Sequence, residues 1–575
     1  MLNAPTKAKA RSCVEAGDRT VTLPQTEQEF LDTIGGRYVS TQVNVQLLRA
    51  WLHQCESEHG EVCMPSLRLP VEKNREAALQ PTFVVDVMQS CLVDTPSQCR
   101  YVALSYVWGT APVFRHLLEN TQDLRKTGSL QSLPIPATIR DAITLVHAIG
   151  ERYLWVDSLC IIQNDLMMQQ AEMMRMGSIY SRALFTIIAA AGDHANSGLP
   201  GVVRGSREQV QKILKFGDCE LLTVIDIRHT PNGIDDTVWA ERAWTFQERV
   251  LSNRVLVFSE SQAYWSCRAA SYSEEQALET ARAIDRLHSL FPQKDATDSL
   301  TWEPLEPLEY RKMYHDLLYS YRQRRLSYET DMLNAFNGVS EILGALQDDT
   351  FHWGLPELIF SYAMTWHFTG PSSRNYVEVP FFDSNGSKEM VPIPSWSWAA
   401  WSGSDPSRPP FLHSGDSADV RPVIQFDIVN EKHQLVRIKD RPMQGPVGDC
   451  VPVLWQHEQP HQLQSLTQHS VSRIGQLQFW TSFANLRVTR ESSDVGVGGV
   501  DYIVFPSPHF LPDPDCTYEV VHQDFIVVAA HDPGKLILLA VDWKDGVAYR
   551  VARIVVDEVD WVGVENREWR LITLG

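Results

Sequence analysis

The stretch YVALSYVWG at residues 101–109 decides the fold class, because it is an apolar, β-prone run that ends on glycine. It predicts a strand. The next segment, LPIPATIRDAITLVHAIG at 133–150, starts with prolines and continues with apolar residues at helical spacing, and RYLWVDSLCII at 152–162 again has the character of a buried strand. Strand, helix and strand in succession predict a parallel βαβ unit.

The alternation continues along the chain. Residues 166–183 carry apolar side chains three or four apart, which predicts a helix, and LFTIIAAAG at 184–192 predicts a second buried strand. Residues 271–370 have helical character, whereas 415–575 contain short β-branched runs separated by turn residues. We therefore expect an α/β fold with a parallel sheet flanked by helices, then a helical segment and a mostly β C-terminal region. The expected regions are an N-terminal extension at 1–95, the α/β domain at 96–270, a helical region with a WSW segment at 271–400, and the mostly β region at 401–575.

Composition excludes several classes of protein. The 575 residues carry a formal net charge of −20 without a cluster of Lys and Arg, so we expect no nucleic-acid partner. The N-terminus lacks an apolar signal core and the longest apolar runs are too short to cross a bilayer, so we expect a cytoplasmic protein without a membrane span. Ten irregularly spaced cysteines suit reduced thiols in that compartment.

Five segments, in order, resemble the fungal heterokaryon incompatibility (HET) family. They are YVALSYVWG at 101–109, LPIPATIRDAI at 133–143, RYLWVDSLCIIQND at 152–165, MGSIYSRALFTIIAA at 176–190 and RAWTFQERVLSNRVLVF at 242–258. The resemblance implies a HET domain at 96–270 in a fungal protein of non-self recognition or cell-death signalling, with a protein partner or self-association. The family is distantly similar to TIR domains, which implies a TIR-like, flavodoxin-like sheet. One departure is Ile162, where the family usually has Asp or Asn.

Parallel sheets bind ligands beyond the carboxyl ends of their strands. This rule makes Ser105, Trp108 and Gly109 candidate ligand-binding residues after the first strand, with Asp157 and Gln163 after the next. In a simpler interpretation, Trp108 and Gly109 form a packed turn, Asp157 caps a helix, and Gln163 forms hydrogen bonds with the backbone amides of a loop.

Some TIR domains cleave NAD with a glutamate four residues after a tryptophan, and the resemblance carries this pattern to Trp244 and Glu248. A carboxylate beside the ribose would stabilise the oxocarbenium-like charge that develops as the nicotinamide bond breaks. Glu248 and Asp157 are therefore the candidate catalytic residues, NAD is a possible substrate, and no cofactor is certain. The alternative for Glu248 is a solvated helix glutamate paired with a nearby arginine.

Three classes of function remain open. The first is non-self recognition or cell-death signalling, which we favour. The second is an enzyme, either an NAD glycohydrolase that uses Glu248 or a biosynthetic enzyme of fungal secondary metabolism on the same scaffold, and the third is a pure interaction module. No H-E-x-x-H, G-x-x-x-x-G-K or G-x-G-x-x-G motif occurs, so metalloprotease, P-loop and Rossmann readings lose their main support.

Two cysteine patterns need weighing. Cys160 could act as a nucleophile, but a cysteine within an apolar run ordinarily packs as a small hydrophobe. Cys55, His59 and Cys63 recur at intervals of four, yet Gly60 interrupts the helix and a structural metal site normally needs four ligands. We therefore predict no metal site, and we expect these side chains to pack on the core.

Overall fold

The computed structural model divides into two compact units, residues 1–300 and 301–575. It describes residues 20–22, 36–64, 80–208, 211–216, 219–223, 234–275, 305–368, 372–382, 388–403, 420–440, 473–492, 503–504, 517–531 and 534–575. Among the helices in these ranges, none is both long and apolar enough to cross a membrane.

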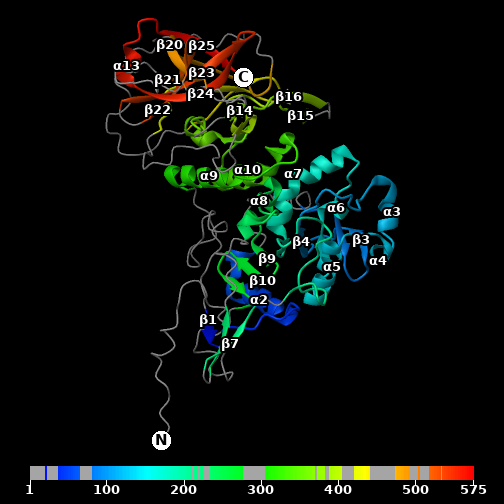
Figure 1. Cartoon of the computed structure of the whole chain (residues 1–575). Helices are drawn as coiled ribbons and strands as arrows, with labels where there is room; N and C mark the ends of the chain where they lie inside the picture. The colour runs from blue at the N-terminus through cyan, green and yellow to red at the C-terminus, as the bar shows by residue number, and fades with distance from the viewer. Residues whose placement is uncertain are drawn as a thin grey trace. The chain divides into compact units, whose positions relative to one another are not determined.

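The first unit is organised by an eight-stranded sheet with the strand order β11-β10-β9-β6-β4-β5-β2-β3 (Figure 1). The strands are β2 (Phe83–Asp86), β3 (Cys91–Asp94), β4 (Tyr101–Ser105), β5 (Tyr153–Trp155), β6 (Thr186–Ala189), β9 (Arg254–Phe258), β10 (Ala263–Cys267) and β11 (Ser271–Ser273). The four middle strands β9, β6, β4 and β5 run parallel, and the strands outside them pair antiparallel. The predicted parallel-containing α/β sheet is confirmed, and residues 83–94 also belong to it.

The order of the parallel strands locates the ligand-binding edge. Along the chain, β4 comes first, β5 second, β6 third and β9 fourth, so the sheet has the order second, first, third, fourth. This is the flavodoxin-like order, in which the crossovers that leave the first and third strands run in opposite directions and open a crevice between these two strands. That crevice lies at the carboxyl ends of β4 and β6.

Helices cover both faces of this sheet. Right-handed crossovers put α5 (Ala137–Ile149) on one face and α7 (Leu166–Arg182) on the other, because the two connections run in opposite directions. Helix α2 (Val45–Glu58) packs against α5, and α8 (Ala243–Val250) packs against α7 (Figure 1). The shorter elements are η1 (Gly60–Cys63), η3 (Leu118–Asn120), α3 (Thr121–Leu124), α4 (Ser129–Ser132), α6 (Asp157–Cys160) and η4 (Ile234–Asp236), and a separate sheet contains β1 (Thr20–Thr22), β7 (Ile213–Phe216) and β8 (Cys219–Thr223).

Local sequence explains where these helices begin and end. Helix α5 follows the extended Pro136 and stops at Gly150, whose φ of 100° is the left-handed conformation that glycine tolerates best. Helix α7 begins after Asp165, whose carboxylate accepts hydrogen bonds from two backbone amides of the first turn. The prediction of one strand over 152–162 is wrong in its second half: β5 ends at Trp155 and the short helix α6 starts at Asp157. Both pieces are buried, so apolar composition could not separate them.

The second unit contains helices followed by a mostly β region, as predicted. Of the stretch predicted to be helical, 271–370, residues 276–304 and 369–370 lie outside the described residues, and 271–273 form the strand β11 instead. The helices of the second unit are α9 (Pro307–Arg322), α10 (Asn334–Gln347), α11 (Phe360–Ala363) and α13 (Glu558–Val562), with the 3-10 turns η6 (Glu329–Asp331), η7 (Glu357–Ile359) and η8 (Trp398–Ala400). Its strands are β12 (Phe351–His352), β13 (Leu355–Pro356), β14 (Ser372–Arg374), β15 (Glu378–Phe382), β16 (Lys388–Pro392), β17 (Trp401–Gly403), β18 (Asp427–Val429), β19 (Leu435–Arg437), β20 (Leu477–Ser492), β21 (Ile503–Val504), β22 (Thr517–His531), β23 (Lys535–Lys544), β24 (Val547–Asp557) and β25 (Glu568–Leu574).

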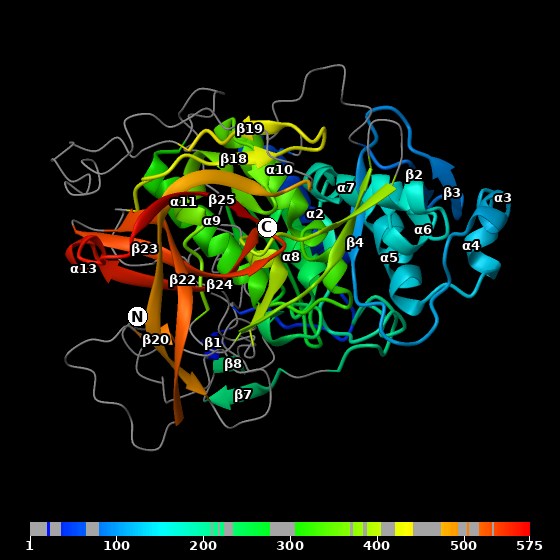
Figure 2. The same ribbon diagram turned by 90° about the horizontal axis from the view of Figure 1, so that it is seen from above.

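Five long strands of this unit close on themselves. The pairing runs from β20 through β22, β23 and β24 to β25, and β25 pairs back to β20 (Figure 2). Alternate side chains, among them Phe525, Val527, Leu536 and Leu538, form an apolar core together with Trp561 from α13. Between β24 and β25 the ring closes through one residue pair, Ala548 with Leu574.

Candidate functional site

The carboxyl end of β4 carries the best-defined polar cluster at the predicted edge. Ser105 is the last residue of β4, and its hydroxyl donates a hydrogen bond to the carboxylate of Glu248 on α8. The same hydroxyl accepts a bond of 2.7 Å from the indole nitrogen of Trp239. Only 1% of Ser105 and 7% of Glu248 is exposed. The structure therefore brings together two of the predicted site residues, and Glu248 is not a solvated surface residue.

Burial makes Glu248 unusual for a carboxylic acid. It raises the pKa of Glu248 to about 7, and the negative charge of Asp157 acts in the same direction. The hydrogen bond from Ser105, the positive charge of Arg242 and the hydroxyl of Tyr180 favour the ionised form and limit the rise. At neutral pH the carboxyl group is therefore close to the midpoint of its titration, which is the property of a general acid or base.

Asp157 lies at the start of α6, just after β5, and is held by its neighbours. One of its carboxylate oxygens accepts a hydrogen bond of 2.8 Å from the indole of Trp108, and the other accepts one of 2.7 Å from the backbone N–H of Ser158. Burial raises the pKa of Asp157, while these hydrogen bonds and Arg242 lower it. Trp108 and Asp157 are half-buried, so this side of the cluster reaches the surface.

Gly109 brings the loops after β4 and β6 together. Its φ is +76°, and a Cβ atom at this position would lie 2.5 Å from the Cβ atom of His194. The neighbouring Trp108 carbonyl accepts a 3.2 Å hydrogen bond from the backbone of Ala195. Glycine is therefore required here both for the left-handed backbone and for the close approach of the loop that follows β6.

Gln163 and Trp244 lie in different surroundings. The side-chain amide of Gln163 donates bonds of 3.1 Å to the carbonyls of Asp157 and Ile161, so it shapes the turn that carries Asp157. Trp244 is half-buried and packs against the apolar core of the first unit. Ile162, the departure from the family pattern, is buried in the same core.

The comparison with protein families identifies the domain that contains this sheet. The model of the family described as "Heterokaryon incompatibility protein (HET)" matches residues 101–248. The chain contains a HET domain. The resemblance is thus confirmed for the first four segments and for residues 242–248 of the fifth. Neither the curated proteins nor the solved structures include a match to the chain. The matched stretch begins at the first residue of β4 and ends at Glu248, so Ser105, Asp157 and Glu248 all lie within the HET domain.

Sequence reasoning gave no site role to three residues of the HET-domain cluster. Trp239 binds Ser105, Tyr180 lies beside Glu248, and Arg242 donates a 2.8 Å bond to the carbonyl of Tyr106. Arg242 stands within the segment that resembles the family, six residues before Glu248, which is a usable signal. Tyr180 has a helical apolar position and Trp239 stands outside any motif, so neither could be distinguished from a core residue.

Cys160 has no sign of activation within the HET domain. It lies in α6 and is buried, with its sulfur 3.3 Å from the backbone nitrogen of Val156. Burial raises the pKa of its thiol. The sequence-based expectation of a strand is wrong for this residue, but its interpretation as a buried hydrophobe agrees with the structure.

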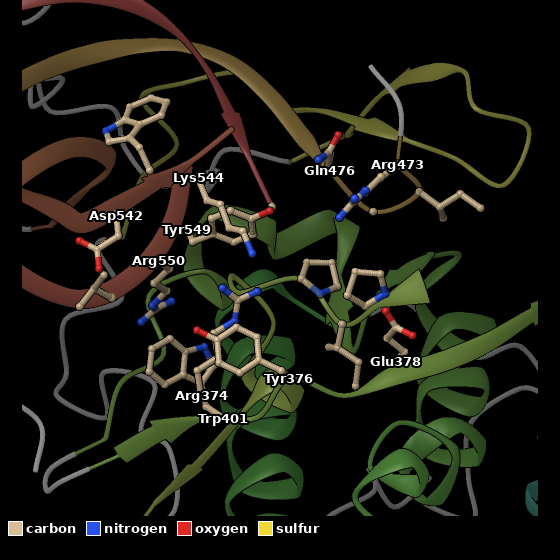
Figure 3. Close-up of a pocket in the computed structure, with 18 residues that line it drawn as sticks. Arg374, Tyr376, Glu378, Trp401, Arg473, Gln476, Asp542, Lys544, Tyr549 and Arg550 are labelled. Carbon is tan, nitrogen blue, oxygen red and sulfur yellow. The ribbon is translucent and has the colours of Figure 1, made fainter. Parts of the chain in front are cut away.

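The second unit contains a pocket of about 570 Å³, separate from the HET domain (Figure 3). Its lining includes the basic side chains of Arg374, Arg473 and Lys544 and the indole of Trp401. The other two tryptophans of the WSW segment, Trp396 and Trp398, are fully buried. Trp396 lies in a turn that follows the proline at 394, and Trp398 is the first residue of the 3-10 helix η8, whose N-cap is Ser397.

Cys55, His59, Cys63 and Cys267 are the residues that could hold a metal within the described ranges. They lie around the end of α2 and the end of β10, in the first unit.

Proposed function

We propose that this HET domain protein acts in fungal non-self recognition or cell-death signalling, in the cytoplasm and through a protein partner or self-association. The family match supports the class of process. It covers the parallel strands β4, β5 and β6, the crossovers between them and α8 as far as Glu248. The proposal assigns the output of the signal to the HET domain.

The observation that carries the proposal is the buried hydrogen bond between Ser105 and Glu248. Burying an ionisable carboxyl group lowers the free energy of unfolding, because the group loses its hydration. A leucine at this position would pack without that cost, so the carboxyl group is expected to serve the function. Glu248 lies at the carboxyl end of the central strand, beside a second carboxyl group and a cation. Such a concentration of titratable groups at a sheet's switch point is typical of a functional site.

The test is induced expression of the full chain in fungal cells, with growth measured over time. The parent chain should arrest growth, and Glu248→Gln should restore it, because the amide cannot exchange the proton. Glu172→Gln is the matched control: Glu172 is also a buried carboxyl group of the HET domain with a hydroxyl donor, Thr82 at 2.5 Å, and a nearby arginine. Normal growth with the parent chain at a confirmed protein level contradicts the proposal.

A second candidate function, NAD glycohydrolysis, is favoured by the same carboxyl group. In this reaction the bond between the nicotinamide nitrogen and ribose C1′ breaks, nicotinamide leaves with the electron pair, and water adds to C1′ and releases a proton. Positive charge develops on the ribose as the bond breaks, and ionised Glu248 would stabilise it. Arg242 supplies a cation on the half-buried side of the cluster, where phosphate groups could lie.

Incubation of the purified full chain with NAD tests this candidate. Nicotinamide and ADP-ribose should appear with the parent chain and with Glu172→Gln, and their rate of formation should fall at least about a hundredfold with Glu248→Gln. Growth arrest without any loss of NAD in the arrested cells would contradict glycohydrolysis while leaving the signalling proposal standing.

A further inference from the structure

We propose that Cys55, His59, Cys63 and Cys267 bind one zinc ion in a closed structural site. One potential ligand atom of each residue lies within 4.8 Å of those of the other three. The three cysteine side chains are completely buried, and all three are free thiols in the structure. This site belongs to the first unit and does not involve the cluster around Glu248.

The chain is shaped to bring the first three ligands together. Cys55 lies in the last turn of α2, and His59 is the C-cap residue of that helix. Gly60 then takes a φ of +50°, a left-handed conformation, and starts the 3-10 turn that ends at Cys63. The glycine that appeared to break the spacing is therefore the residue that turns Cys63 back towards Cys55.

The fourth ligand comes from a distant part of the sequence. Cys267 is the last residue of β10, and its sulfur lies 3.4 Å from Nδ1 of His59, 208 residues earlier. Helix α2 packs against β10, which explains how the two ends meet. This distant residue removes the objection that only three ligands were present.

The ligand set selects the metal. Three thiolates and one imidazole form a soft set that suits zinc and not magnesium or calcium, which prefer oxygen. With zinc–sulfur bonds of about 2.3 Å, a tetrahedron places its sulfurs roughly 3.8 Å apart, which the observed cluster can reach with small side-chain movements. Four protein ligands leave no open position, so the site would stabilise the fold and would not perform catalysis.

Neighbouring groups support this assignment. The guanidinium of Arg254 donates a 3.0 Å hydrogen bond to the sulfur of Cys55 and a 3.1 Å bond to the carbonyl of Leu184. Zinc with three thiolates has a net charge of −1, which the buried cation of Arg254 would balance. The hydroxyl oxygen of Tyr272 lies 3.5 Å from Nε2 of His59, where it can accept a hydrogen bond from the ring N–H and leave the Nδ1 lone pair for the metal.

The zinc content of the full-length protein tests the proposal. Protein purified under reducing conditions and dialysed with zinc should retain about one zinc per chain, and Cys267→Ser should retain less than roughly one tenth of that amount. Cys91→Ser is the matched control, because Cys91 is a buried cysteine at the end of a strand pair in the same sheet, and it should retain the full amount.

Replacing zinc with cobalt in the parent chain provides a second test, which does not depend on whether Cys267→Ser folds. The parent chain loaded with Co²⁺ should show the visible absorption of a tetrahedral thiolate complex, and added zinc should remove it. Less than roughly one tenth of a zinc per parent chain, without this absorption, would overturn the proposal. A disulfide between two of the three cysteines in the reduced preparation would overturn it equally.

Discussion

The hydroxyl of Ser105 donates a hydrogen bond to the carboxylate of Glu248, 143 residues further along the chain. This contact joins the end of the central strand β4 to helix α8 at the sheet edge where ligands bind in this strand order. Trp239 binds the same hydroxyl, so Ser105 is an acceptor for one buried group and a donor to another. The first prediction concerns the carboxyl group of this pair.

Glu248→Gln should flatten the dependence of stability on pH. The pKa of Glu248 is raised from 4.5 to about 7 in the folded chain, so its protonated form stabilises the fold. This contribution is complete below about pH 4.5 and is lost as the pH rises to about 7, with an upper limit of about 3 kcal/mol. Denaturation midpoints of parent and variant between these pH values measure the effect. Equal pH slopes for the two proteins would show that Glu248 has an ordinary pKa.

Ser105→Ala should destabilise the first unit by about 1–3 kcal/mol, because it leaves the indole N–H of Trp239 and the carboxylate of Glu248 without their shared partner. It should also raise the pKa of Glu248 further, since the lost hydrogen bond favours the ionised form. Urea denaturation at several pH values measures both effects. Ser181→Ala, which removes only a bond to a helix carbonyl, should change stability by less.

Asp157→Asn should lower the pKa of Glu248, because it removes a nearby negative charge and preserves an acceptor for the indole of Trp108. The fall in stability with rising pH would then begin at the same pH as in the parent chain, but it would end at a lower pH and be smaller. Asp141→Asn, a change at a buried aspartate that accepts from the backbone of Leu199, is the control. An unchanged profile for Asp157→Asn would mean that the two carboxyl groups do not interact.

Gly109→Ala should be more destabilising than Gly128→Ala. Both glycines have a positive φ, +76° and +79°, so both variants carry the cost of a left-handed alanine, about 1 kcal/mol. Only the Cβ atom at 109 meets a neighbour, His194, whereas the space around position 128 is open. The difference between the two denaturation midpoints isolates the close approach of the loops after β4 and β6. Equal losses would mean that this approach does not constrain the fold.

Much of the parallel sheet could be predicted because its signals are local. The strand at 101–105 and the helices at 137–149 and 166–182 follow from periodicity, prolines and a capping aspartate within a few residues. The boundary between β5 and α6 could not be found this way, because both pieces are apolar and buried. The closure of β20 on β25 was also beyond prediction, since strand partners depend on the whole fold.

The candidate sites could be predicted only in part, because some of their residues meet partners that are distant in the sequence. Ser105, Asp157 and Glu248 were found because strand ends and a family resemblance marked them. Trp239 and Cys267 were missed because each meets its partners only through the order of strands in the sheet. Composition and spacing describe only residues that are close along the chain, whereas the partners of Trp239 and Cys267 are far away in the sequence.

The most direct test of the central claim, that the Ser105–Glu248 cluster carries the function of the HET domain, compares growth arrest with stability for two matched variants. Glu248→Gln and Glu172→Gln each replace one buried carboxyl group in the same domain. At equal protein levels and with both variants folded, we expect growth arrest by Glu172→Gln and none by Glu248→Gln. Growth arrest by Glu248→Gln at the level of the parent chain would contradict the account and make Glu248 a packing residue.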